Sequence, residues 1–133
     1  MQHVVEIFLE PVKSSEVAQV AIVAVVLLTL LDVCFGVLNA LLHREFSSSK
    51  MREGIAHKST SFGFILVADV VDAAIIAGLD LGFSAPVLVF ACSYLVLMEI
   101  ASLLETFCKL NPNLKDSPLF KLFAAAHVEE LQK

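Results

Sequence analysis

Leu31-Asp32-Val33-Cys34-Phe35-Gly36-Val37-Leu38-Asn39-Ala40-Leu41-Leu42 decides the fold, because it carries an aspartate inside a long apolar run. The run begins near Val17, and as a helix with a rise of about 1.5 Å per residue it reaches about 39 Å. That length exceeds the roughly 30 Å hydrocarbon core of a bilayer. The stretch therefore predicts a membrane-spanning helix with an ionisable group inside the membrane.

The composition agrees with a membrane protein. The chain has 133 residues, of which 58% are hydrophobic and 17% are charged, and its mean hydropathy is +0.84. A soluble domain is typically about half apolar and about a quarter charged. The net charge of -5 argues against a nucleic-acid partner, because phosphate binding needs clustered Lys and Arg. The first residues carry Glu6, Glu10 and Glu16 against Lys13, which is unlike the basic start of a secretory signal.

Hydropathy and helix-end signals divide the chain into one all-α membrane domain with three transmembrane helices. Ser14-Ser15-Glu16 is typical of a helix start, and so is Ser117-Pro118. Asp80 to Pro86 is typical of a tight turn. The predicted segments are an amphipathic N-terminal helix at 1–16, spans at 17–42, 61–81 and 86–108, a basic loop at 43–60, and a tail at 109–133 with a second amphipathic helix.

Basic residues predict the orientation of the spans. The loop at 43–60 carries four of them, and the tail carries four lysines. The positive-inside rule places such segments in the cytoplasm, so we expect the N-terminus outside and the C-terminus inside the cell. The loop residues that set this topology are Arg44, Lys50, Arg52 and Lys58.

Carboxyl groups within the expected spans are the main functional candidates. No Lys or Arg lies in the expected spans to neutralise them. Two interpretations stay open: protonated acids bonded between helices, or acids that line a water-filled path or an oligomer interface. Three helices cannot enclose a polar lumen and also face lipid, so we expect a homo-oligomer. The candidate pore-lining or interface residues are Asp32, Gly36, Asn39, Asp69, Asp72, Glu99, Ser102 and Glu105.

No pattern in the sequence indicates an enzyme, a metal site or a cofactor. Nucleophile-elbow, zinc-protease, P-loop and dinucleotide motifs are missing from the sequence. The four histidines fall outside the expected spans, and none is spaced to share a metal with another. The three cysteines fit no zinc or redox spacing. These residues are His3, His43, His57 and His127, and Cys34, Cys92 and Cys108.

The chain resembles the phage-lysis and toxin-secretion holins, including the holin-like proteins of clostridial toxin loci, in three features. The first is Leu31-Asp32-x-x-x-Gly36-x-x-x-Ala40. The second is the loop from Phe46 to Lys58, with its serines, glycine and following lysine. The third is Glu99-Ile100-Ala101-Ser102-Leu103-Leu104-Glu105-Thr106, where Thr106 replaces the usual Asn. The glycine expected after the third span is also replaced, around Leu110-Asn111.

The resemblance implies a protein that accumulates in the bacterial cytoplasmic membrane, self-associates and opens lesions. The lesions would release an endolysin that lyses the host, or in some loci a large toxin. No catalytic residue is implied. Two other functions remain open at this stage. One is a small proton-coupled transporter, since intramembrane acids serve proton relays, although the sequence shows no inverted repeat. The other is a non-conducting scaffold or an antiholin that binds a holin.

Overall fold

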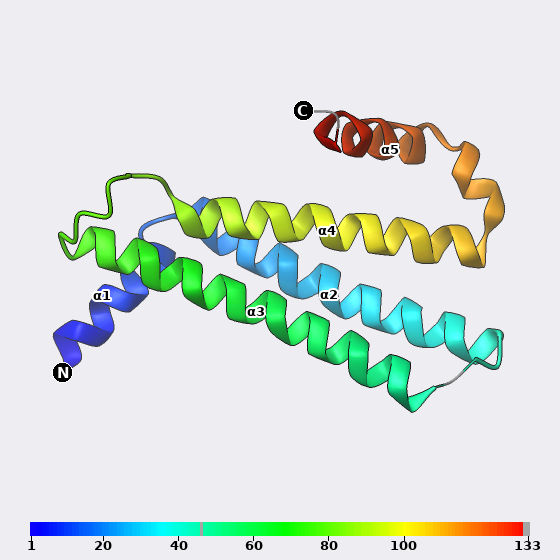
Figure 1. Cartoon of the computed structure of the whole chain (residues 1–133), viewed down its shortest axis with the longest axis horizontal. Helices are drawn as coiled ribbons and strands as arrows, with labels where there is room; N and C mark the ends of the chain where they lie inside the picture. The colour runs from blue at the N-terminus through cyan, green and yellow to red at the C-terminus, as the bar shows by residue number, and fades with distance from the viewer. Residues whose placement is uncertain (46, 132–133) are drawn as a thin grey trace.

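The computed structural model describes residues 1–45 and 47–131, and the described chain is helical (Figure 1). Phe46 of the holin-like loop, and Gln132 and Lys133 of the expected tail, lie outside the described residues. The elements in chain order are α1 (Gln2–Lys13), α2 (Glu16–Leu42), α3 (Ser48–Ile76), α4 (Val87–Leu110), the 3-10 helix η1 (Pro112–Asp116) and α5 (Pro118–Leu131).

Three of these helices, α2, α3 and α4, are long and apolar enough to cross a membrane. α4 packs against both α2 and α3, with α2 and α4 running in the same direction and α3 returning between them along the chain (Figure 1). The predicted all-α fold with three spans is therefore confirmed. The first and third predicted spans, 17–42 and 86–108, match α2 and α4 to within two residues at each end.

The second span differs from the prediction. Helix α3 begins at Ser48, so the segment expected as a loop over 43–60 is mostly helix, and α3 ends at Ile76 rather than at 81. Hydropathy marks where a helix enters lipid and not where the helix begins. The residues of α3 before Phe62 are mostly polar, but several of them, such as Lys, Arg, Met and Glu, are good helix formers. Helix α2 ends where Arg44 takes a left-handed conformation (φ 53°) and Glu45 N–H donates a hydrogen bond to Ala40 O at 3.0 Å.

The opposite end of the bundle has the tight turn that the sequence predicts. Gly78 adopts φ +94°, which lets Leu79 N–H donate to Ala74 O at 3.0 Å and ends α3. The Asp80 carboxylate then accepts a hydrogen bond from Gly82 N–H at 2.9 Å. The chain enters α4 directly after Pro86.

An apolar core joins all three long helices in the half of the bundle that is remote from the α2–α3 connection. Val12 of α1 packs on this core, and Gln19 Nε2 donates to Val12 O at 3.0 Å, which holds α1 across the end of the bundle. Ser15 Oγ accepts from Ala18 N–H at 3.1 Å, as expected of a helix cap. The core residues are Ala18, Val25, Ile65, Ala68, Leu88, Ala91, Cys92 and Leu95.

Candidate functional site

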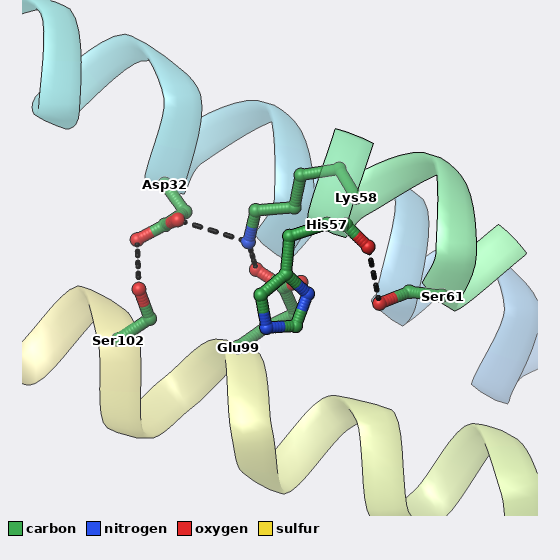
Figure 2. Close-up of polar contacts among 6 residues, drawn as sticks. All are labelled: Asp32, His57, Lys58, Ser61, Glu99 and Ser102. Carbon is green, nitrogen blue, oxygen red and sulfur yellow. Dashed lines mark hydrogen bonds and ion pairs between the residues drawn. The ribbon is translucent and has the colours of Figure 1, made fainter. Parts of the chain in front are cut away.

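Four polar side chains from the three long helices meet near the middle of the bundle (Figure 2). Lys58 of α3 lies between a carboxylate of α2 and a carboxylate of α4. Its Nζ is 2.9 Å from Asp32 Oδ2 and also donates a hydrogen bond to Glu99 Oε2. Ser102 Oγ of α4 donates to the other Asp32 oxygen at 2.8 Å. We call Asp32, Lys58, Glu99 and Ser102 the mid-bundle cluster.

The ion pairs of this cluster are largely shielded. The side chains of Asp32, Lys58 and Glu99 are 12%, 20% and 5% exposed. Burial of ions is costly unless each is paired and hydrogen-bonded, and the cluster meets that condition. Two carboxylates share one ammonium group, so the fully ionised cluster keeps one excess negative charge. Loss of the lysine is therefore far more disruptive electrostatically than loss of one acid.

Lys58 is the residue that sequence reasoning misplaced. The expectation that no Lys or Arg neutralises these acids is wrong, because α3 extends over Lys58 and brings it against Asp32 and Glu99. The helical spacing of Lys58 relative to the acids of the same helix indicates this role in the sequence. Lys58, Asp69 and Asp72 are spaced i, i+11 and i+14, which puts them on one helical face. A cation on the face that carries the acids is their natural partner.

Asp72 has a different environment at the end of α3. Its two carboxylate oxygens accept hydrogen bonds from Val87 N–H and Leu88 N–H, each at 2.9 Å. These groups belong to the first turn of α4, where N–H groups lack helical partners and the helix dipole favours negative charge. Asp72 thus caps α4 from the neighbouring helix. Among the described residues, no hydrogen-bond partner reaches the buried Asp69 Oδ1 or the buried Thr29 Oγ1.

We expect Asp72→Ala to lower the free energy of unfolding by about 2 kcal/mol, since it removes a cap and a favourable dipole interaction. Asp72→Asn retains one acceptor and should cost about half as much. Detergent-unfolding curves of the purified variants, followed by circular dichroism, measure both. Equal stability of Asp72→Ala and the wild-type protein would contradict the capping role.

A groove of about 440 Å³ opens beside the mid-bundle cluster, between α2 and the first part of α3. Gly36 and Gly54 lie on opposite walls, and a Cβ atom built on either glycine would meet no atom within 4 Å. Asn39 also lines the groove, and its buried Oδ1 has no hydrogen-bond partner within the described residues. The small pair Gly36 and Ala40 therefore faces open space and not another helix of the same chain.

The remaining predicted residues lie apart from the cluster. Glu105 is exposed and pairs with Lys109 at 2.7 Å on the outer face of α4. Lys50 lies 3.9 Å from Glu45 at the mouth of the groove, and both are exposed. Arg44 and Arg52 are exposed near the α2–α3 connection. No group of three or more His, Cys, Asp or Glu residues in the described part of the chain is arranged to hold a metal ion.

Three apolar helices joined by a buried ionic cluster define a helical integral membrane protein. The chain belongs to the bacteriophage holin family, whose model matches residues 16–118. Members of this family are membrane proteins and not enzymes. The match covers all three long helices and leaves α1 and nearly all of α5 outside it. No protein of curated function and no solved structure matches the chain.

Proposed function

We propose that this protein assembles in the bacterial cytoplasmic membrane into lesions that release an endolysin, or a large exported protein such as a toxin. The mid-bundle cluster carries this proposal. Asp32 and Lys58 each lie about 15 Å along their helices from the α2–α3 connection, at about 1.5 Å per residue. That distance is about half of a bilayer core. Ionisable groups at such depth typically mark a water-filled path.

A single chain does not supply such a path. Beyond the cluster, the apolar core fills the bundle from Ile65 and Leu95 to its end. The acids can meet water across the whole membrane only if helices of several chains surround a common lumen. Asp32, Glu99 and Ser102 are the side chains that we assign to the lumen wall, with Asp69 further along α3. Closed symmetric assemblies are the usual form of such oligomers.

The groove supplies a surface for assembly. Small residues let helices of membrane proteins approach closely, and Gly36 and Ala40 present that surface to open space. An Asn side chain carries both a donor and an acceptor, so Asn39 can bond to Asn39 of a second copy. Lipid chains have no donor for its unpartnered oxygen. We therefore assign Gly36, Asn39 and Ala40 to the contact between chains.

Orientation follows from the exposed basic residues of the same half. Arg44, Lys50 and Arg52 lie at or near the α2–α3 connection, which we place on the cytoplasmic side. The N-terminus and the α3–α4 turn then lie outside. Asp72 is part of the α4 cap at that outer end, and Glu105 lies on the outer face of α4, which leaves both outside the lumen wall.

Induced expression in a bacterial host, with and without a co-expressed endolysin, tests this function. We expect collapse of the membrane potential in both cultures and lysis only where the endolysin is present. An intact potential at high membrane abundance would reject the lesion and would favour a non-conducting antiholin. Proton-driven uptake by vesicles that contain the purified chain, without release of a co-trapped protein, would favour a transporter.

A further inference from the structure

The first part of α3 is held to the bundle very differently from the second part. Residues 48–57 are all exposed, and Lys58 is the first residue of the helix whose side chain is shielded. From Ile65 onward, α3 contributes to the apolar core. In the same half of the bundle, α2 and α4 remain joined by apolar packing, including an edge-on contact of Phe35 and Phe107 with ring centroids 4.7 Å apart.

The groove adds to this contrast. It separates α2 from residues 50–55 of α3, so apolar contact across it is small. Lys58 spans the base of the groove and is bonded to Asp32 on one side and to Glu99 on the other (Figure 2). The ion pairs of this lysine thus connect the first part of α3 to the α2–α4 pair.

A weak helical segment follows directly after Lys58. The hydroxyl groups of three consecutive residues donate to carbonyl groups one turn earlier: Ser59 to Ile55 at 2.9 Å, Thr60 to Ala56 at 3.0 Å, and Ser61 to His57 at 3.4 Å. Such bonds compete with the backbone ladder and commonly bend helices. Gly63 follows within one turn, and glycine lowers helix stability further. Kinks in helices concentrate at segments with this composition.

We propose that residues 48–58 form a movable segment, the lever, which the ion pairs of Lys58 hold against α2 and α4. When these ion pairs break, the lever rotates about a pivot at Ser59–Gly63. Release opens the groove and leaves Asp32 and Glu99 facing it, where the helices of a neighbouring copy can reach them. The biological role of the lever, which is to expose the acids to a neighbouring copy, rests on the proposed function. Its movement, however, is a property of the single chain and can be measured without any lesion.

Spin labels on the purified full-length chain in lipid nanodiscs test whether the ion pairs of Lys58 hold the lever in place. Labels at Met51→Cys on the lever and Met98→Cys on α4, both exposed positions, report their separation in a background with the three native cysteines replaced. The wild-type sequence should give one narrow distance, and Lys58→Met should replace it with a broad, longer distribution. A narrow distance that persists in Lys58→Met would overturn the proposal.

Matched variants separate lever movement from unfolding. Lys50→Met removes an exposed lysine of the same helix and should leave the distance unchanged. Labels at Val67→Cys and Met98→Cys report the anchored part of α3 and should stay narrow in Lys58→Met. The charge-exchanged variant Asp32→Lys/Lys58→Asp, combined with Glu99→Gln to remove the carboxylate that would repel the new acid, keeps one pair of opposite charges facing each other and should restore the narrow distance. If the charge-exchanged variant gives the same broad Met51–Met98 distance distribution while the Val67–Met98 distance stays narrow, the ion pairs do not hold the lever in place.

Substitutions that stiffen the pivot, none of which lies in the mid-bundle cluster, give a second test. Ser59→Ala/Ser61→Ala/Gly63→Ala removes two back-bonding hydroxyls and the glycine, and a Cβ at Gly63 meets no atom within 4 Å. Combined with Lys58→Met, it should narrow the Met51–Met98 distance again. Alone, it should slow the loss of membrane potential at equal protein abundance. If neither change occurs, the pivot is rejected. If the wild-type chain opens no lesion, the function is rejected and the distances still decide the lever.

Discussion

Replacing both carboxylates of the mid-bundle cluster, as Asp32→Asn with Glu99→Gln, should lower the free energy of unfolding by about 3–5 kcal/mol, because Lys58 then lies buried without a counter-charge. Each single replacement should change it by less than about 1 kcal/mol. One ammonium and one carboxylate remain in either single variant, and the excess negative charge is removed. The two substitutions are therefore expected to be strongly non-additive, as is typical of residues in one ionic network.

Unfolding of the purified chain in mixed micelles by added SDS, followed by circular dichroism, measures this coupling. Glu45→Gln serves as the control, because it removes the acid of an exposed ion pair, in which Lys50 Nζ lies 3.9 Å from Glu45 Oε2. Such a surface pair contributes about 0–1 kcal/mol. Adding Lys58→Met to the double variant should recover most of the lost stability, because no charge then remains in the cluster. If the two acid replacements change the free energy of unfolding by small, additive amounts, the Lys58 ammonium group reaches water and does not need the two carboxylates as counter-charges.

The fold followed from the sequence where hydropathy and helix ends coincide. The apolar runs of α2 and α4 start and stop close to their helix termini, so the ends of both helices were predictable to within two residues. In α3 the two signals separate, because the polar residues from Ser48 to Ser61 continue the helix outside the apolar run. Helix propensity does not distinguish such an extension from a helical turn within a loop.

For the candidate site, the sequence predicts which acids take part but not which basic residue pairs with them. Asp32, Glu99 and Ser102 were singled out as intramembrane polar residues, and the structure brings these three together. Their partner Lys58 lies in the polar segment before the apolar run that begins near Phe62, so hydropathy places it in the loop. Which acid meets which helix depends on the rotation of α3 about its axis. That rotation follows from which face of α3, carrying Ile65 and Ala68, is buried in the shared apolar core.

Replacing Gly36 with leucine should leave the single chain folded and abolish lesion formation. A Cβ at this position meets no atom within 4 Å, and leucine favours helix over glycine by about 0.8 kcal/mol. The free energy of unfolding should therefore stay the same or rise slightly. The side chain would occupy the groove that we assign to contact between chains and would keep a second helix from approaching Ala40 and Asn39.

Gly63→Leu is the matched control, because its Cβ also meets open space but the residue lies outside the groove. Both variants should accumulate in the membrane like the wild-type chain, as judged by immunoblot. Only Gly36→Leu should keep the membrane potential intact and reduce the size of the detergent-solubilised complex. Since Gly63 belongs to the proposed pivot, its variant can delay lesion formation but should not change complex size. If Gly36→Leu assembles and depolarises like the wild-type chain, the chains meet through another surface, and the open groove between α2 and α3 then serves only the movement of the lever.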